Sequence, residues 1–218
     1  HLCDRRQRQM CIRDSYKRIL SLDSAMAVVQ FKKDHVVYQR NYFISYPANV
    51  MVMRFSADQP GKQNLVFSYA PNPVSTGNMA SDGNKGLVYS ASLDNNGMKY
   101  VVRIQAETKG GTLFNADGKL TVKGADEVVF YITADTDYKP NFDPDFKDSK
   151  TYVGVNPEET TKEWMNNAVS QGYTALFSQH YNDYAALFDL VKLNLNPAIK
   201  GKNMPTPQRL KNYRAGHP

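Results

Sequence analysis

Cysteine is nearly absent from this sequence of 218 residues, and so is any long apolar run. The two cysteines, Cys3 and Cys11, both lie in the first fifteen residues, so the rest of the chain can form neither a disulfide framework nor a thiolate metal site. No apolar stretch approaches the roughly 20 residues that a membrane-spanning helix requires. The four histidines are scattered and leave no pair spaced to hold zinc. These absences favour a globular domain stabilised by its own hydrophobic core.

A net positive charge is also lacking from most of the chain, although the net charge of the whole chain is +6. Residues 1–18 contain six basic and two acidic side chains, and residues 199–218 contain five basic side chains and no acidic one. The remaining residues, 19–198, therefore carry a net charge of −3. A folded nucleic-acid-binding surface needs a basic patch of its own. This distribution argues against nucleic acid as a partner.

Residues 1–15 do not fit the pattern of the rest of the chain. They show no hydrophobic periodicity and lack the apolar segment of a secretory signal. The stretch from Met10 to Ser15 resembles adapter read-through of the kind found in translated metagenomic assemblies. We therefore expect residues 1–15 to be a non-native leader, with a natural basic arm as the alternative.

Between residues 16 and 135 the sequence contains many short stretches that alternate apolar and polar residues. In one of them Tyr100, Val102 and Ile104 share a face, and Lys99 and Arg103 share the other. Turn signals separate the stretches, namely Lys33-Asp34, Pro47-Ala48-Asn49, Pro60-Gly61, Asn95-Asn96-Gly97, Gly110-Gly111 and Asp117-Gly118. A stretch rich in Pro, Gly, Asn and Ser at 71–85 predicts a loop. Short strands without intervening helices predict a mainly β fold, an antiparallel β-sandwich of the supersandwich type.

The pattern changes after Asp135. Residues 136–156 predict a long loop, and Asn156-Pro157-Glu158-Glu159 predicts the start of a helix that ends near Gly172. A second helix is indicated by an apolar stripe at helical spacing: Tyr173, Leu176, Phe177, His180, Tyr181, Tyr184, Leu187 and Phe188. We expect 136–196 to be a loop and a short two-helix linker. Thr206-Pro207 could cap a last short helix within 197–218.

Acidic residues cluster in the loop after the last predicted strand: Asp135, Asp137, Asp143, Asp145 and Asp148. Carboxylates at short spacing can bind Ca²⁺, so Asp143, Asp145 and Asp148 are candidate metal ligands. The spacing is not that of an EF-hand, and the pattern favours a solvated acidic loop. Two of these carboxylates could also form a glycosidase pair, which stands about 5–10 Å apart, but any acidic loop offers such a pair. We therefore expect no metal site and no cofactor.

Four aromatic residues and one histidine are further site candidates. Tyr138, Phe142, Phe146 and Tyr152 could stack on sugar rings, but such residues more often hold a long loop against its own domain. His180 lies on the apolar helical stripe, which favours a hydrogen-bonded core histidine over a catalytic one. The sequence contains no nucleophile elbow and no phosphate-binding loop.

Three segments carry a resemblance to a known family. The first, 16–50, ends in Ser45-Tyr46-Pro47-Ala48-Asn49-Val50; the second is 120–126; the third is 180–195, with 205–210 after it. Together they resemble glycoside hydrolase family 95, the α-L-fucosidases with some α-L-galactosidases. Leu190 departs from the family pattern, in which arginine is frequent at that position.

This resemblance implies a division of the chain. Residues 16–135 correspond to an N-terminal accessory β-sandwich that lacks its first strands, and 197–218 to the entry of an (α/α)6 barrel. In that family the barrel holds the acid and base of an inverting hydrolysis, so no catalytic residue is expected in this chain.

The resemblance also implies a function for the full-length protein, an exported bacterial enzyme, periplasmic or secreted, that acts on fucosylated glycans. This chain would support the barrel through intramolecular contact and be inactive alone. The alternative is a stand-alone carbohydrate-binding β-sandwich without catalysis.

Overall fold

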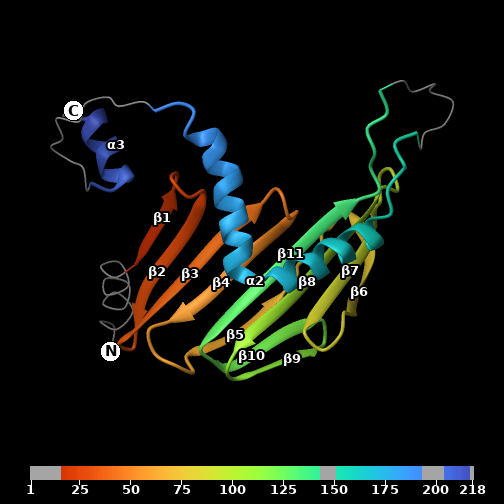
Figure 1. Cartoon of the computed structure of the whole chain (residues 1–218), viewed down its shortest axis with the longest axis horizontal. Helices are drawn as coiled ribbons and strands as arrows, with labels where there is room; N and C mark the ends of the chain where they lie inside the picture. Colours follow the sequence, from red (N-terminus) through yellow and green to blue (C-terminus); the bar gives the residue numbers. More distant parts are fainter. Residues whose placement is uncertain (1–15, 143–150, 193–203, 217–218) are drawn as a thin grey trace. The chain divides into compact units, whose positions relative to one another are not determined.

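The alternating stretches form antiparallel strands in two sheets (Figure 1). The computed structural model describes residues 16–142, 151–192 and 204–216. The chain divides between Leu187 and Phe188 into two units, which are described separately. The larger sheet of the first unit consists, in spatial order, of β1 (Lys17–Ser21), β2 (Met26–Lys33), β3 (Val36–Ser45), β4 (Val50–Ala57), β11 (Glu127–Thr136), β8 (Lys99–Lys109), β7 (Gly86–Leu93) and β6 (Ser75–Ser81). The smaller sheet consists of β5 (Gln63–Ser68), β10 (Lys119–Ala125) and β9 (Thr112–Ala116).

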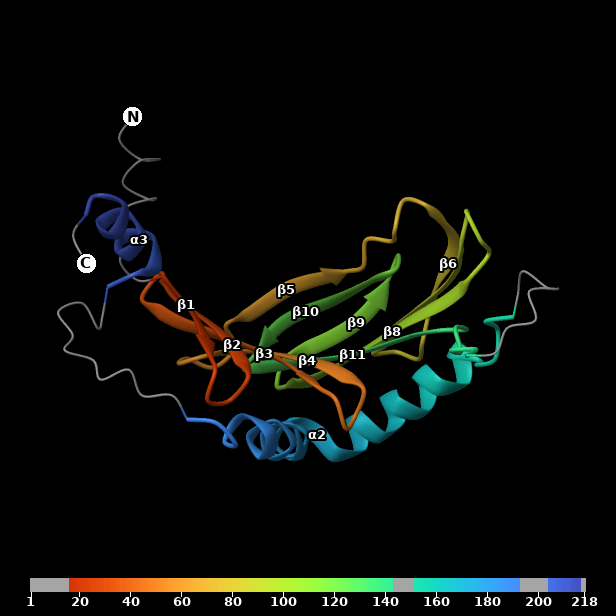
Figure 2. The same cartoon turned by 90° about the horizontal axis from the view of Figure 1, so that it is seen from above.

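The smaller sheet packs against one face of the larger sheet, and this confirms the predicted sandwich (Figure 2). Because side chains alternate along a strand, every second residue of the central strands points into this layer. The fully buried side chains here are Leu87, Val102, Ile104, Ala106, Val128 and Phe130 from the larger sheet, and Leu120, Val122 and Ala125 from the smaller one. This core cluster contains no residue of β1 or β2.

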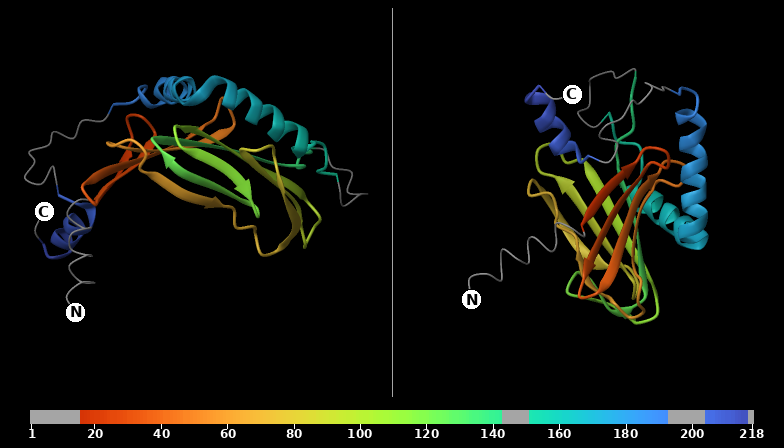
Figure 3. Two further views of the ribbon diagram at one scale, coloured as in Figure 1. Left: turned by 90° about the horizontal axis from the view of Figure 1, so that it is seen from below. Right: turned by 90° about the vertical axis from the view of Figure 1, so that its left-hand side faces the viewer.

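The opposite face of the larger sheet is covered by α2 (Pro157–Phe188), as Figure 3 shows. Phe43, Val50, Val52, Val129 and Tyr131 of the sheet pack there against Met165, Ala168 and Leu176 of the helix. The central strands are therefore apolar on both faces, which explains why β11 reads as an almost continuous apolar run.

Helix α2 is bent at Gly172, whose φ of 71° and ψ of 172° are not helical. Glycine adopts a positive φ without the steric penalty of a Cβ atom, so the bend falls on the residue that tolerates it best. The sequence predicted two helices meeting at this residue, and the structure confirms the position of the break.

Several of the predicted turns contain residues in the left-handed backbone conformation. Asp34 and His35 both have positive φ, as do Asp117 and Gly118, and this is the geometry of tight two-residue hairpins. Asn49 adopts the same left-handed conformation in the turn between β3 and β4.

The prediction of a loop over 71–85 was wrong, since β6 lies within it, and β9 was not foreseen. β6 has the sequence Ser-Thr-Gly-Asn-Met-Ala-Ser and occupies the edge of the larger sheet beside β7. An edge strand exposed to solvent needs few apolar residues, so alternation is absent. β9 is only five residues long and lies between two turns.

The second unit contains α3 (Thr206–Arg214). Its N-cap is Pro205, and no side chain caps it, so the expected cap by Thr206 was wrong; Thr206 is instead the first residue of the helix. Among the helices of the described ranges, none is both long and apolar enough to cross a membrane.

Candidate functional site

Two aspartates of the predicted acidic cluster have structural roles, and the remaining ones lie outside the described residues. The Asp137 carboxylate accepts a hydrogen bond from the Lys99 backbone N–H at 3.0 Å, and its own N–H donates to the Lys99 carbonyl. Asp135 accepts a bond from the Thr136 N–H at 2.8 Å. Asp143, Asp145 and Asp148 fall in the undescribed segment 143–150. No group of three or more potential metal ligands occurs within the described ranges.

Two aromatic residues of the same loop contact each other, and one of them also contacts the domain. Tyr138 and Tyr152 stack with ring centroids 6.2 Å apart, and the Tyr152 hydroxyl donates to the Asn96 carbonyl at 3.2 Å. Phe142 is 96% exposed, and Phe146 lies outside the described residues.

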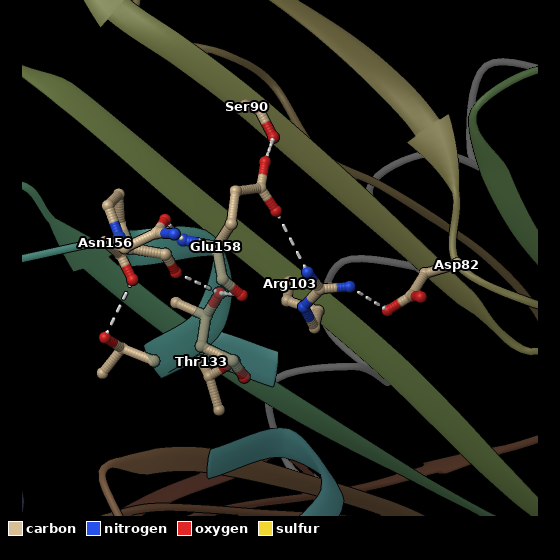
Figure 4. Close-up of polar contacts among 9 residues, drawn as sticks. Asp82, Ser90, Arg103, Thr133, Asn156 and Glu158 are labelled. Atoms are coloured by element: carbon tan, nitrogen blue, oxygen red, sulfur yellow. Dashed lines mark hydrogen bonds and ion pairs between the residues drawn. The ribbon is translucent and has the colours of Figure 1, made fainter. Parts of the chain in front are cut away.

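A group of charged and polar side chains lies where α2 begins, and we call it the helix-docking cluster: Asp82, Ser90, Arg103 and Glu158 (Figure 4). The Arg103 guanidinium donates to Asp82 Oδ2 at 2.5 Å and to Glu158 Oε2 at 3.2 Å. The Ser90 hydroxyl donates to the other oxygen of Glu158. Arg103 is only 6% exposed, whereas both carboxylates remain partly accessible to water. The cluster therefore connects β7, β8 and the turn after β6 to the first turn of α2.

The start of α2 is fixed by further hydrogen bonds around this cluster. The Asn156 side chain accepts from the Glu158 N–H at 3.2 Å, which is the bond expected of an N-cap residue. Thr133 of β11 donates through its hydroxyl to the Thr161 carbonyl at 3.0 Å, in a fully buried position. Glu158 itself lies in the first turn, where a negative charge interacts favourably with the helix dipole.

A second polar contact lies near the bend of α2. Arg54 donates to Glu127 Oε2 at 2.5 Å, and its guanidinium lies 4.8 Å from the ring centre of Tyr173. The hydrogen bond to Glu127 raises the pKa of Arg54 above its ordinary value, against the opposing effect of burial. The Tyr173 hydroxyl in turn accepts from the Asn41 amide at 3.2 Å.

His180 occupies a packed position, as the sequence indicated. Its ring stacks on Phe43 at 5.0 Å, and Nε2 lies 3.1 Å from the Ala25 carbonyl in the turn between β1 and β2. His180 therefore connects the second half of α2 to β3 by an aromatic stack and to the turn between β1 and β2 by a hydrogen bond.

Four carboxylates on this side of the larger sheet bind other side chains of the protein, and one of them, Glu107, accepts a hydrogen bond from a buried tyrosine. Tyr131 is fully buried and donates to Glu107 Oε2 at 2.8 Å; burial first, and then this hydrogen bond, raises the pKa of Tyr131 far above its ordinary value. In contrast to a hydrolytic centre, where two carboxylates face a substrate, Asp82, Glu158, Glu127 and Glu107 face arginine or tyrosine. The contacts of Glu158 with Arg103 and of Arg54 with Tyr173 hold α2 on the larger sheet.

Sequence reasoning did not identify the helix-docking cluster. It assigned Arg103 to the polar face of its strand, and the structure shows that α2 covers that face. One feature of the sequence could have indicated a buried charge: Arg103 interrupts the apolar stretch from Tyr100 to Ile104.

The chain is similar in sequence to two known proteins. It is 30% identical over 210 residues to "Probable alpha-fucosidase A" of Aspergillus niger and 24% identical over 239 residues to "Alpha-L-fucosidase 2" of Arabidopsis thaliana. Each match covers 92% of this chain and 26% of the relative, so the chain spans about a quarter of the length of these relatives.

A solved structure titled "Putative kojibiose phosphorylase from human microbiome" is similar with a TM-score of 0.48 and 9% identity, over 78% of this chain and 24% of that one. The sequence profile of the N-terminal domain of glycosyl hydrolase family 65 matches residues 7–141, which is more than half of the chain. The chain therefore belongs to the family of glycosyl hydrolase family 65 N-terminal domains.

Proposed function

We propose that this chain is the non-catalytic N-terminal part of a longer α-L-fucosidase of glycoside hydrolase family 95. The observation that carries the proposal is the similarity to two proteins named as fucosidases over 92% of this chain. The segments 16–50 and 180–195 support the same assignment, because they resemble family 95. The hydrolysis inverts the anomeric configuration, and the substrates are fucosylated glycans.

The proposal assigns a role to each part of the chain. Residues 16–135 form the accessory sandwich, whose first strands precede this chain, and 136–196 form the linker. Residues 197–218 lead into an (α/α)6 barrel that holds the catalytic acid and base. Residues 1–15 are a leader foreign to the protein, and the enzyme is exported by a bacterium. The helix-docking cluster then serves to fix the linker helix, and with it the barrel, on the sandwich.

Two proteins expressed from the source gene test the proposal: one from the reading frame extended past Pro218, and the 218 residues alone. The extended protein is expected to release fucose from fucosyl oligosaccharides, and the short chain to release none. Turnover by the short chain would contradict the proposal, as would a stop codon soon after Pro218, which would instead indicate a stand-alone carbohydrate-binding module. Galactosyl substrates assayed in parallel distinguish fucosidase from galactosidase activity.

A further inference from the structure

A cavity of about 380 Å³ lies between the start of β5 and the strands β2, β3 and β4. Its volume is within the range of about 300–1,000 Å³ that is typical of small-ligand sites. Phe31, Tyr38, Phe55 and Leu65 form the apolar part of its lining. Phe31 and Tyr38 stack with ring centres 5.1 Å apart. No residue of the helix-docking cluster lines this cavity, so it is separate from the contacts that hold α2.

Strands β1–β4, three of which line the cavity, carry positive charge only. They contain two basic residues in β1, two in β2 and one in each of β3 and β4, and no acidic residue. Residues 19–198 as a whole, in contrast, have a net charge of −3. A cavity surrounded by charge of one sign raises the local concentration of ligands of the opposite sign.

Three of these basic residues share the face of the sheet that lines the cavity. Arg18 is paired with Val29, and Val29 with Arg40, so Arg18 and Arg40 lie on the same face. Arg40 and Lys33 both line the cavity, as does Lys62 just before β5. No acidic side chain belongs to the lining. The cavity therefore favours an anionic ligand.

Arg40 is held in position by aromatic rings and not by a carboxylate. Its guanidinium carbon lies 5.1 Å from the ring centre of Phe31 and 5.3 Å from that of Phe55. None of the ion pairs of the described ranges includes Arg40. A guanidinium that lies over a ring keeps the N–H groups in its own plane available as donors. Arg40 can therefore bind an anionic group in the cavity.

Gln63 supplies a second donor. Its side chain is only 5% exposed, and its amide nitrogen has no hydrogen-bond partner within residues 16–142, 151–192 and 204–216. Gln63 is paired with Ala125 of the core, and it also lines the cavity. Buried donors are nearly always hydrogen-bonded, so an acceptor is expected at this position. A ligand oxygen in the cavity would provide it.

We propose that this cavity binds an acidic sugar residue of an oligosaccharide, one that carries a carboxylate or a sulfate group. The anionic group accepts hydrogen bonds from Arg40 and from the Gln63 amide, and the exposed Lys33 and Lys62 add positive charge at the rim. The apolar face of the sugar ring packs on the stacked rings of β2 and β3.

The choice of a sugar follows from the family of the chain, which is that of a glycosyl hydrolase domain. The inference rests on the proposed function insofar as it gives the glycan substrate an acidic group. A single-stranded nucleic acid would need a basic groove that follows successive phosphates, whereas Lys33, Arg40 and Lys62 meet at one cavity.

Isothermal titration calorimetry with the full-length protein and with the 218-residue chain tests this inference. The probes are a sulfated fucose oligosaccharide, its desulfated form, a uronic-acid oligosaccharide of the same length, and inorganic sulfate. At least one acidic oligosaccharide is expected to bind about tenfold or more tightly than the neutral one, because charge-assisted hydrogen bonds are roughly twice as strong as neutral ones. Equal affinity for acidic and neutral oligosaccharides would overturn the inference. Inorganic sulfate that binds as tightly as the acidic oligosaccharides would do the same.

Variants locate the binding. Arg40→Met keeps an apolar side chain beside the rings and is expected to weaken binding of the acidic oligosaccharide about tenfold, because a hydrogen bond to a charged group is lost. Lys62→Met, at the exposed rim, is expected to weaken it roughly two- to fivefold. This second variant leaves the buried part of the site intact, so it tests the site even if Arg40→Met lowers the stability. Lys85→Met removes the same charge at an exposed residue outside the cavity and should leave the affinity unchanged.

Three results with these proteins would overturn the inference. Equal weakening by Arg40→Met and Lys85→Met would indicate a general effect of charge. Tighter, Arg40-dependent binding of single-stranded DNA would indicate a nucleic-acid site. Binding by the 218-residue chain but not by the full-length protein would show that another part of the polypeptide fills the cavity. None of these results depends on the release of fucose, so a full-length protein that binds acidic sugars without releasing fucose would contradict the proposed function alone.

Discussion

At the scale of single residues, Arg103 carries a charge into a part of the sheet that α2 covers, where two carboxylates bind it. Arg103→Met keeps an unbranched apolar side chain in place of the arginine stem but removes both ion pairs. Hydrogen bonds to charged groups contribute about 1.5–3 kcal/mol, and the partly exposed carboxylates can be rehydrated, so we expect the free energy of unfolding to fall by about 1.5–3 kcal/mol in urea denaturation.

Lys192→Met is the matched control for Arg103→Met, because the ion pair of Lys192 with Asp189 is exposed. Exposed pairs contribute roughly 0–1 kcal/mol, so this variant should be close to neutral. Equal destabilisation by the two variants would show that Arg103 does not hold α2.

Tyr131 makes the stability of the domain depend on alkaline pH. The folded chain keeps its hydroxyl protonated, because the pKa is raised, whereas tyrosine in the unfolded chain ionises near its ordinary value of 10.0. This contribution to stability is therefore complete below about pH 10 and is lost as the pH rises above it. Tyr131→Phe removes this dependence along with the hydrogen bond to Glu107, which is worth about 1–3 kcal/mol. The difference in unfolding free energy between wild type and variant should decrease from about pH 9 to about pH 11; a constant difference would contradict the assignment.

At the scale of secondary-structure elements, the second half of α2 is held mainly by Phe43, whose ring contacts Tyr173, Phe177 and His180. Phe43→Ala is expected to lower the free energy of unfolding by about 3–5 kcal/mol, because it leaves a cavity in a buried aromatic group. Limited proteolysis should then cut α2 after the bend at Gly172 sooner than before it. Phe142→Ala, at a fully exposed ring, is the control and should leave the pattern unchanged.

How well the elements could be predicted depends on what holds each of them. Strands buried on both sides, such as β8 and β11, and the turns with glycine or asparagine were evident from the sequence, because local patterning and backbone preference decide them. β6 was missed because pairing with β7, and not apolar burial, holds it in place. The sequence offered Arg103 as an unusual residue but not its partners, since Asp82, Arg103 and Glu158 come together only when α2 crosses the sheet. The candidate ligands Asp143, Asp145 and Asp148 were proposed from composition and spacing alone, and they lie outside the described residues.

At the scale of the whole molecule, each side of the larger sheet has its own core within the first unit, and that unit ends at Leu187. A chain shortened to residues 1–188 is therefore expected to unfold with the same midpoint in urea as the 218-residue chain. Shortening to residues 1–171 instead removes Leu176 and His180 from the core and should destabilise the domain by several kcal/mol. If both truncations lowered the midpoint equally, the second unit would have to contribute to the stability of the first.

The position of β11 between β4 and β8 has a consequence for synthesis on the ribosome. Strands β1–β4 form one sequential meander and β6–β8 another, and β11 joins them. At a translation rate of about 5–20 residues per second, β11 is made roughly 4–16 s after β4. During that interval the edge strands of both meanders are available to chaperones or to neighbouring nascent chains. The strand that closes both edges is the last strand of the sandwich to be made, so protection against misassembly is complete only when residue 136 has left the exit tunnel.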